Sequence, residues 1–369
     1  MRVIQLISTI AFGDAVSNDT LALQDVIKSM GYTTRIYAES VVTPYDSKIA
    51  LPIEEVGELS KDDIAIYHLS TGSQLSFDFA DYKCRKIVIY HNITPPEFFD
   101  GNNQFIKGIN EWGLEGARYL KDKVDYCLAD SEFNKQNLID MGYTCPIDVL
   151  PIVIPMKDYQ KTPAKAAMKD FGDNYTNIMF AGRVAPNKKQ EDIIAAFYYY
   201  KKLYNPNSRL ILVGSCKPEE VYFQRLQTYI RRLGIRDVIF TGHRKFNYIL
   251  GCYKSADVFV CMSEHEGFCV PLVEAMMFDV PVIAYNSTAI PWTLNGSGIL
   301  LDDKDPVLVA GCIDKLVKDN NLKQQVIQKQ RERLKDFEYE KIAIMFKEYL
   351  NAFINGQKKW GFIWKRLVL

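Results

Sequence analysis

The chain has 369 residues, more than a single hydrophobic core usually organises, so we expect two domains. Hydrophobic residues make up 48% of the sequence and charged residues 24%, which is ordinary globular usage and excludes extensive disorder and fibrous repeats. The 45 Lys and Arg balance 45 Asp and Glu, which argues against a protein that coats nucleic acid.

This balance hides a difference between the two halves. Residues 1–155 carry 13 basic and 22 acidic side chains, a net charge of −9, and the rest of the chain carries 32 and 23, a net charge of +9. An anionic ligand would therefore bind more readily to the second half. The alternative is a chance distribution of surface charge.

Short apolar runs alternate with helical patterns through the first half. Strands are predicted at residues 3–8, 34–38, 63–69, 86–92 and 126–131. After the first strand, a turn at Gly13-Asp14 leads into a helix that we expect to begin at Asn18 or Asp19 and to stop at Gly31. Strands this apolar, separated by helices, predict a parallel sheet covered on both faces.

Three prolines between residues 149 and 165 mark a linker, and the same rhythm then restarts. Strands are predicted at 177–184, 209–214, 238–243, 256–263 and 280–285, and helices at 315–335 and 337–354. We therefore expect two doubly wound, Rossmann-like α/β domains, residues 1–155 and 156–337, with a C-terminal helix (338–369) that rejoins the first. Such domains face one another across a cleft at the carboxyl ends of their strands, where ligands bind.

The cysteines and the termini indicate the compartment. None of the eight cysteines forms a C-x-x-C pair, so we expect free thiols and no metal cluster. The apolar N-terminal stretch is too short to span a bilayer and has no cleavage site, which predicts a cytoplasmic chain. The tail 358–369 has four cations, no acid, two Trp and one Phe, so it fits either an anionic membrane surface or a face of the first domain.

The most informative segment runs from Ser263 to Met276, where a strand ends, a loop follows and a proline enters the first turn of a helix. Backbone amides at a helix N-terminus bind phosphate. Those expected here belong to Gly267, Phe268, Cys269 and Val270. Glu266 and Glu274 flank this anion site, and since a phosphate repels carboxylates, we expect them to accept hydrogen bonds from sugar or ribose hydroxyls. Without this sequence context, Glu266 and Glu274 would each be interpreted as an ordinary solvent-exposed acid.

A second loop supplies positive charge after the strand at 177–184. Gly182 permits close approach of the backbone, Arg183 can form two hydrogen bonds to phosphate oxygens, and Lys188 adds a further charge at the start of the next helix. Such residues alone are common in solvated loops, but their pairing with the glutamate loop predicts a diphosphate site.

The E-x7-E spacing of Glu266 and Glu274, the G-R-x4-K of the second loop and the sequence EAM-F-D-VPVIAY together resemble family four of the nucleotide-sugar glycosyltransferases, retaining enzymes with the GT-B fold. The resemblance covers the second half strongly. It implies that Arg183 and Lys188 hold the donor diphosphate, that Glu274 holds the nucleotide ribose and that Glu266 contacts the transferred sugar.

In the first half the resemblance is looser. It implies that Gly13 approaches the donor phosphates and that His91, in IYHNITP, lies near the transferred sugar. A histidine that ends a buried strand can also be a hydrogen-bonded core residue. The chain departs from the family where Cys269 replaces a glycine, where Trp292 follows Pro291 and where Asp14 follows a single glycine, so Asp14 could instead bind acceptor or water.

These observations and the resemblance predict a glycosyltransferase that moves a hexose from a nucleoside-diphosphate sugar to a saccharide or lipid-linked saccharide, in cell-surface polysaccharide or glycoconjugate biosynthesis. The resemblance implies that the anomeric configuration is retained. The segment EHEGFCVPL is similar to the corresponding segment of polysaccharide mannosyltransferases. It therefore favours GDP-mannose over UDP-hexoses as the donor. No D-x-D pair follows a strand, so we expect cationic side chains, and no metal or other cofactor, at the diphosphate. The alternatives are a nucleotide-sugar epimerase and a non-catalytic two-domain sugar-binding protein.

Overall fold

The computed structural model describes residues 1–42 and 49–356, and the predicted membrane-binding tail, 358–369, lies outside them. The chain divides into two compact units. The first consists of Met1–Pro96, Gly108–Pro155 and the chain from Asp336 onward, and the second of Glu97–Lys107 and Met156–Lys335. The sequence placed residues 97–107 in the first domain, whereas the structure groups this segment with the second.

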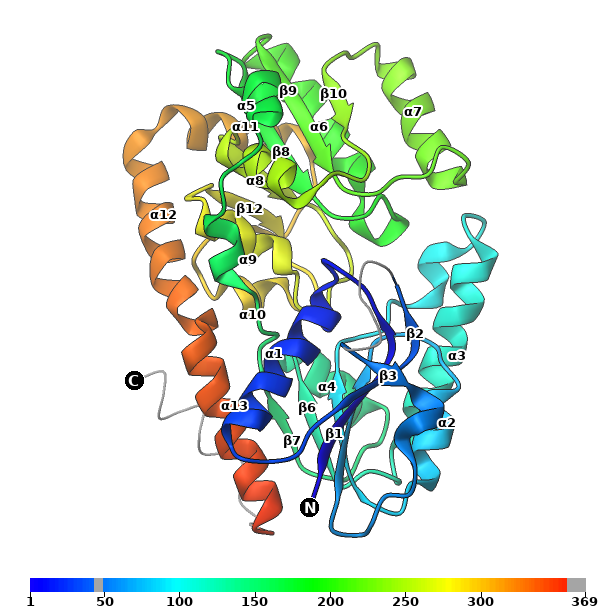
Figure 1. Cartoon of the computed structure of the whole chain (residues 1–369). Helices are drawn as coiled ribbons and strands as arrows, with labels where there is room; N and C mark the ends of the chain where they lie inside the picture. The colour runs from blue at the N-terminus through cyan, green and yellow to red at the C-terminus, as the bar shows by residue number, and fades with distance from the viewer. Residues whose placement is uncertain (43–48, 357–369) are drawn as a thin grey trace. The chain divides into compact units, whose positions relative to one another are not determined.

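The first unit is built on a seven-stranded parallel sheet of order β3-β2-β1-β4-β5-β6-β7 (Figure 1). Its strands are β1 Val3–Ile10, β2 Ile36–Val41, β3 Leu51–Pro52, β4 Ile64–Leu69, β5 Arg85–Tyr90, β6 Tyr126–Ala129 and β7 Ile147–Val149. Its helices are α1 Ala15–Ser29, α2 Leu75–Asp78, α3 Gln104–Leu120 (whose first turn belongs to the second unit), α4 Glu132–Asp140 and α13 Tyr339–Ile354. Short 3-10 turns lie at Ile53–Val56, Phe79–Asp81 and Pro96–Phe99, the last of which belongs to the second unit from Glu97 onward.

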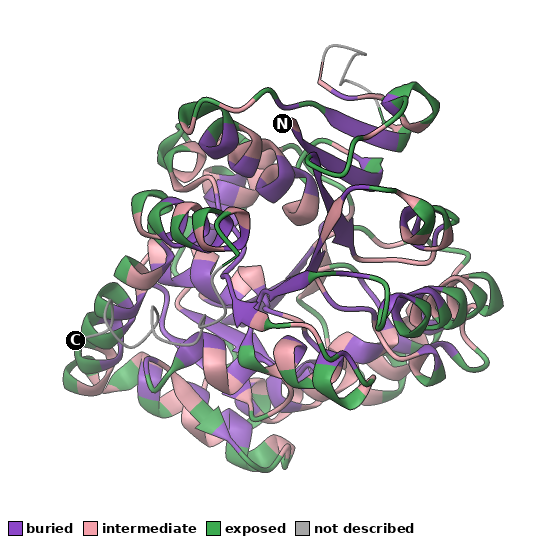
Figure 2. Cartoon of the chain, turned by 90° about the horizontal axis from the view of Figure 1, so that it is seen from below, coloured by how far each residue is buried: buried purple, intermediate pink, exposed green. Residues whose placement is uncertain are grey.

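Both faces of this sheet are buried, because alternate residues of its strands enter different cores (Figure 2). Ile64 and Ile66 pack with α1 and α13 on one face, whereas Ala65 and Tyr67 pack with α2, α3 and α4 on the other. The helix at the C-terminal end of the described chain thus completes the core of the first unit.

Helix α1 begins earlier than predicted. Its N-cap is Asp14, whose side chain accepts a hydrogen bond from the Ser17 backbone N–H at 2.9 Å, so the expected start at Asn18 or Asp19 is wrong. Asp14 therefore caps a helix in this structure. Asp19 lies inside the helix, 1% exposed, and accepts the backbone N–H of Val153 at 2.7 Å.

The second unit contains a six-stranded parallel sheet of order β10-β9-β8-β11-β12-β13. Its strands are β8 Thr176–Ala181, β9 Ser208–Val213, β10 Val238–Phe240, β11 Val258–Cys261, β12 Val282–Tyr285 and β13 Ile299–Leu301. Its helices are α5 Lys165–Phe171, α6 Gln190–Leu203, α7 Val221–Leu233, α8 Phe246–Lys254, α9 Val270–Met277, α10 Ile290–Leu294, α11 Pro306–Lys318 and α12 Asn320–Leu334, with 3-10 turns at Met156–Gln160, Pro186–Lys188 and, shared with the first unit, Lys335–Phe337.

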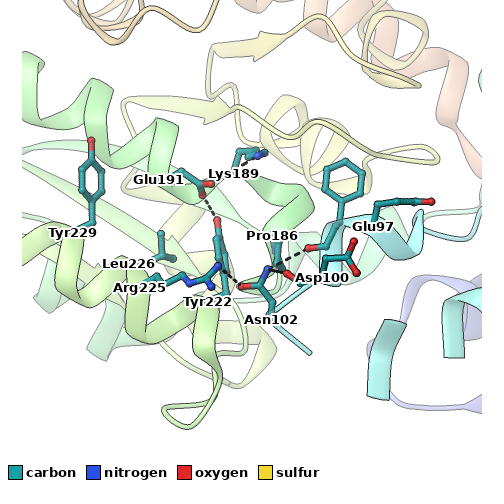
Figure 3. Close-up of a pocket in the computed structure, with 11 residues that line it drawn as sticks. Glu97, Asp100, Asn102, Pro186, Lys189, Glu191, Tyr222, Arg225, Leu226 and Tyr229 are labelled. Atoms are coloured by element: carbon teal, nitrogen blue, oxygen red, sulfur yellow. Dashed lines mark hydrogen bonds and ion pairs between the residues drawn. The ribbon is translucent and has the colours of Figure 1, made fainter. Parts of the chain in front are cut away.

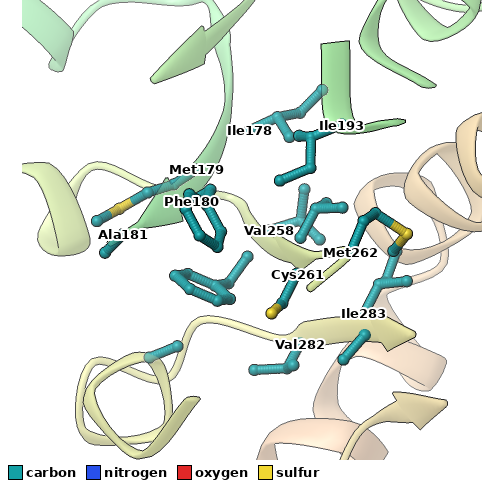
Figure 4. Packing of buried hydrophobic residues seen from close by; sticks show 14 of the residues in the cluster. Ile178, Met179, Phe180, Ala181, Ile193, Val258, Cys261, Met262, Val282 and Ile283 are labelled. Carbon is teal, nitrogen blue, oxygen red and sulfur yellow. The ribbon is translucent and has the colours of Figure 1, made fainter. Parts of the chain in front are cut away.

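The central strands of this sheet form a continuous apolar core. Ile178, Phe180, Val258 and Ile283 are at most 2% exposed and pack between helices on the two faces (Figure 4). Each such side chain stabilises the fold by about 1.5–3 kcal/mol relative to its exposed state. Because β8 and β11 are parallel neighbours, the loops that follow them leave the same edge of a rigid sheet.

Candidate active site

The two predicted loops meet where β8 and β11 end. Lys188 Nζ donates to both carboxylate oxygens of Glu266 at 2.7 Å. The lysine side chain is 22% exposed and the glutamate 8%, so the ion pair lies at the mouth of the sheet rather than in open solvent. Burial lowers the pKa of Lys188, but the nearby Glu266 carboxylate outweighs it and raises that pKa, which keeps the lysine charged.

Hydrogen bonds fasten these loops to one another. The side-chain amide of Asn187 donates to the backbone oxygen of His265 at 3.1 Å, and the backbone N–H of Glu264 donates to the oxygen of Asn187 at 2.9 Å. Lys304 adds a bridge between the Glu264 carboxylate and Asp192, at 2.7 and 3.0 Å. The basic loop is therefore positioned by neighbouring backbone as well as by the Lys188–Glu266 pair.

Arg183 extends from the same edge and is exposed. It makes no ion pair within residues 1–42 and 49–356. Its backbone is held tightly, because a Cβ on Gly214 would lie 2.2 Å from the oxygen of Gly182. Only a glycine at the end of β9 allows this close approach. The closely packed backbone thus presents an exposed cationic side chain to any ligand at the edge.

Helix α9 starts directly beside the Lys188–Glu266 pair. Its N-cap, Cys269, has φ +71° and ψ +64°, a left-handed conformation that glycine adopts more easily, and Pro271 enters its first turn as predicted. Phe268 and Cys269 are buried, and Gly267 and Val270 are partly exposed. The amides expected to bind phosphate therefore belong to the start of a real helix.

Glu274, one turn into α9, has partners that the sequence did not reveal. Tyr159 Oη and Tyr253 Oη donate to its two carboxylate oxygens, each at 2.5 Å. Burial raises the pKa of Glu274, and these two hydroxyls oppose the rise. The carboxylate is held rigidly, and a ribose hydroxyl would share it with, or displace, a tyrosine. Tyr159 lies in the linker and Tyr253 in α8, so no residue spacing in the sequence indicates that both contact Glu274.

Two cysteine thiols converge on the Glu266 carboxylate, so that three side chains able to bind a metal lie together. Cys261, Glu266 and Cys269 are buried and bring their sulfur and oxygen atoms within 4.8 Å of one another. All eight cysteines are free thiols, as expected. The convergence of two thiols shows that spacing along the sequence did not capture every cluster of potential metal ligands.

A polar cavity of about 380 Å³ opens in the second unit between the Glu97–Lys107 segment and α7 (Figure 3). Arg225 donates to Asn102 at 3.1 Å across it, and Tyr222 donates to Glu191. Its polar lining residues are Glu97, Asp100, Asn102, Lys189, Glu191, Tyr222, Arg225 and Tyr229. A second cavity, of about 180 Å³, shares Asn102 and Tyr222 with it and is lined by Arg183. Neither cavity was predicted from the sequence.

The predicted residues of the first unit lie at the carboxyl edge of its own sheet. Gly13 is exposed, with φ +77°, in the turn between β1 and α1. His91 follows β5, but its side chain is only 1% exposed: Nδ1 contacts Asp130 Oδ2 and Nε2 contacts His68 Nδ1, both at 2.9 Å. Burial lowers the pKa of His91, and the Asp130 carboxylate outweighs it and raises that pKa. The ring is turned into a buried network, and the roles expected of His91 and Gly13 at the donor stay predictions.

The structure thus brings Lys188 and Glu266 into direct contact and places Arg183, Glu274 and the start of α9 on the same unit, around the ends of neighbouring strands. No helix in residues 1–42 and 49–356 has both the length and the apolar character needed to cross a bilayer.

Comparison with known proteins identifies the second unit. Residues 163–333 match the family model described as glycosyl transferases group 1. A D-inositol 3-phosphate glycosyltransferase of Corynebacterium jeikeium is 29% identical over 221 residues, which cover 55% of this chain and 52% of that protein. The O-antigen chain mannosyltransferase B of Escherichia coli is 25% identical over 266 residues, covering 69% of this chain and 67% of that protein. The chain spans about half the length of several curated relatives that it matches.

Solved structures extend the likeness to nearly the whole chain. Sucrose-phosphate synthase from Thermosynechococcus elongatus superimposes with a TM-score of 0.74 at 17% identity and covers 97% of this chain and 100% of that one. HepE of Anabaena, in complex with UDP and glucose, gives 0.73 at 19% identity, covering 95% and 100%. At these identities the structures establish the architecture alone. Residues 163–333 of this chain thus match the group 1 glycosyltransferases, and its two parallel sheets have the GT-B fold.

Proposed function

We propose that the protein transfers a hexose from a nucleoside-diphosphate sugar to a hydroxyl of a saccharide or lipid-linked saccharide, and that its second unit binds the donor. The observation that carries this proposal is the contact of Lys188 Nζ with both oxygens of Glu266, which joins the basic loop after β8 to the glutamate loop before α9. A diphosphate and a sugar need these two kinds of group side by side.

In this proposal Arg183, Lys188 and the amides at the start of α9 bind the diphosphate. Lys188 reaches the phosphate by sharing or leaving its contact with Glu266. The freed Glu266 carboxylate then accepts a hydrogen bond from a hydroxyl of the transferred sugar. Glu274, held by Tyr159 and Tyr253, accepts the ribose hydroxyls. As the glycosidic bond to the donor breaks, negative charge develops on the leaving diphosphate, and each well-aimed donor lowers the barrier by about 3–4 kcal/mol.

Two cationic side chains and a helix N-terminus can neutralise the leaving diphosphate, so we propose that transfer needs no divalent ion there and no other cofactor. We further propose that the anomeric configuration is retained, which rests on the resemblance of the Glu266 and Glu274 spacing to retaining enzymes. Analysis of the product by NMR tests this, and an inverted anomer would overturn it.

The names of the relatives guide the choice of substrates. One is an O-antigen chain mannosyltransferase and another acts on a sugar chain linked to undecaprenol diphosphate. We therefore propose a growing surface polysaccharide or glycoconjugate as acceptor and GDP-mannose as the first donor to test. The polar cavity beside Tyr222, lined by tyrosine, amide and carboxylate groups, suits the hydroxyls of a saccharide.

A lipid-linked acceptor would require the cytoplasmic enzyme to work at the membrane, which fits the composition of residues 358–369. Flotation of the whole chain and of a chain ending at Gly356 with anionic vesicles tests this. The whole chain is expected to float and the shortened one to remain behind, and equal behaviour would remove the membrane proposal.

The experiment for the main proposal combines binding and turnover. GDP-, UDP-, ADP- and dTDP-sugars are added to the protein, and one is expected to raise its melting temperature, since a ligand at 100 times its Kd adds about 2.7 kcal/mol of stability. The same donor should then be consumed only with a saccharide acceptor, and Arg183→Ala should abolish the shift. Release of a free epimer without acceptor would instead favour the epimerase, and binding without turnover the sugar-binding protein.

A further inference from the structure

Five polar side chains are packed together at the carboxyl edge of the first unit's sheet. Asp19 lies on α1, His68 in β4 and His91 directly after β5, and their side chains are at most 2% exposed. Gln5 of β1 contacts the Nε2 atom of His68, and Asp130, which follows β6, contacts the Nδ1 atom of His91. We call these two residues the outer partners, because they contact the ring nitrogens that do not face the other imidazole. Buried polar groups of this number need a specific arrangement of protons or ions.

The outer partners fix the imidazole tautomers. Gln5 Nε2 donates to the backbone oxygen of Thr20 at 2.9 Å, so Gln5 Oε1 faces His68 Nε2, at 2.9 Å, as an acceptor. The Asp130 carboxylate likewise accepts from His91 Nδ1 at 2.9 Å. Both outer ring nitrogens are therefore donors, and neutral rings point their inner lone pairs at one another. This pattern of carboxylate or carbonyl behind each imidazole is the one that orients metal-binding histidines.

The three inner atoms converge on one point. His68 Nδ1 and His91 Nε2 are 2.9 Å apart, and Asp19 Oδ2 is 3.9 Å from the first and 4.0 Å from the second. A triangle with these sides has a point about 2.1 Å from every corner, which matches the distances of roughly 2.0–2.2 Å at which zinc binds imidazole nitrogen and carboxylate oxygen. The two rings are nearly parallel, with centroids 5.2 Å apart, and their inner nitrogens now face one another, so each ring must turn to direct its lone pair at the ion.

Two lone pairs and a carboxylate oxygen repel one another unless a proton or a metal ion lies between them. A single proton between the imidazoles balances only one of the carboxylates of Asp19 and Asp130 when both are ionised. A divalent ion balances both carboxylates. Two imidazoles and one carboxylate are a set that suits zinc and similar transition metals and does not suit magnesium, which prefers oxygen ligands.

We propose that Asp19 Oδ2, His68 Nδ1 and His91 Nε2 form a binding site for one divalent transition-metal ion, with Zn²⁺ as the expected metal, and that Gln5 and Asp130 orient the two histidines. The ion would join α1 to the ends of β4 and β5 and stabilise the first unit. Its ligands all belong to the first unit, whereas the proposed metal-independent binding of the diphosphate concerns the second. With Nδ1 on Asp130 and Nε2 on the ion, His91 would have no ring nitrogen left for the transferred sugar, so this proposal replaces the role expected of His91 at the donor.

The test uses the whole chain, freed of metal with a chelator and then titrated with Zn²⁺ and, separately, with Co²⁺ as a spectroscopic substitute. We expect one tightly bound ion per chain by elemental analysis, a higher melting temperature, and a Co²⁺ spectrum of tetrahedral character without a thiolate charge-transfer band. If the metal-free chain takes up no ion, a proton joins the histidines and the proposal is wrong. This measurement needs no variant.

Variants then locate the ion. His68→Gln should lose it, and Asp130→Asn should weaken its affinity about 10–100-fold because only an outer partner changes. His243→Gln is the matched control and should keep the full stoichiometry. Cys261→Ser tests the other convergent cluster, and loss of the ion in that variant alone would place the metal at the thiols and overturn the proposal. Circular dichroism of each variant confirms that a lost ion does not reflect unfolding.

Discussion

In the proposed function, Lys188 binds a donor phosphate only by sharing or giving up its contact with Glu266, so we expect donor binding to change the charge around the sugar. Both side chains are largely shielded from water. Removing one partner leaves the other with an uncompensated charge, whereas removing both does not. This difference separates the structural role of the pair from its catalytic role.

We therefore expect Lys188→Met and Glu266→Gln each to lower the free energy of unfolding by about 2 kcal/mol, less than for a fully buried pair, because the lysine is partly exposed. The double variant should lose less than the sum. Transfer should fall roughly 10²-fold or more in all three. Urea unfolding and steady-state kinetics measure the two effects, and recovery of activity in the double variant would contradict the assigned roles.

Glu274 supplies a prediction about pH. Burial raises its pKa, and the hydroxyls of Tyr159 and Tyr253 oppose this by hydrogen bonding to the ionised form. In the double variant Tyr159→Phe/Tyr253→Phe the pKa should therefore rise further. Ribose hydroxyls need the ionised carboxylate as acceptor, so donor affinity is lost as the pH falls through this pKa.

In the double variant, the loss of donor affinity at low pH should therefore begin at a higher pH. Calorimetric titration of the nucleotide between pH 5 and 8 measures this, because proteins are most stable in roughly that range. Tyr248→Phe is the control, because that hydroxyl of the same unit bonds Asp170 instead. An unchanged limb would show that the tyrosines do not tune Glu274.

The ends of β8 and β9 approach so closely that one glycine decides the geometry of the basic loop. Gly214 has φ +141°, and a Cβ there would lie 2.2 Å from the oxygen and 2.7 Å from the carbonyl carbon of Gly182. Neither is a flexible side-chain atom. The strand ends would have to separate, and Arg183 would move with them.

We expect Gly214→Ala to cost about 2–4 kcal/mol of stability, from overpacking and backbone strain together, and to weaken donor binding. Gly296→Ala is a matched control in the same unit, because Gly296 has φ +79° but no atom lies within 4 Å of its Cβ position. It should cost only the left-handed penalty of about 1–2 kcal/mol. Equal losses in chemical denaturation would show that the close approach does not matter.

Elements with a strong local signal could be predicted, and those set by distant partners could not. The apolar strands β1, β4 and β8 lie where expected. The short edge strands β3, β7 and β13 were missed, because two or three residues carry no period and β7 lies beside the prolines of the linker. Asp19 looked like a helix cap, but its partner is the Val153 N–H, 134 residues away.

The same division holds at the site. The order of a parallel sheet brings loops after neighbouring strands together, which is why Lys188 and Glu266 meet as the motifs implied. The tyrosines on Glu274 come from the linker and from α8, and the segment that lines the cavity comes from residues 97–107, assigned by sequence to the other domain. These contacts depend on tertiary packing and correspond to no residue spacing that could be recognised in the sequence.

At the scale of the molecule, two cores are built from interleaved pieces of chain. The core of the first unit needs the returning helix α13, whose Phe346 and Leu350 are at most 1% exposed. The core of the second unit is formed by residues between Phe171 and Val326. Each sheet is covered by its own helices, so each unit has the means to unfold as a separate transition.

Calorimetry of the whole chain can assign these transitions, because a core substitution acts on one unit and a donor nucleotide on the other. Phe346→Ala should lower one melting transition, by about 3–5 kcal/mol in stability, and a saturating donor should raise the other by an amount that grows with the logarithm of its concentration. The donor should bind Phe346→Ala as tightly as the unchanged chain. A single transition that both changes move would mean that the units unfold together, and a donor that raises the transition lowered by Phe346→Ala would place its site in the first unit.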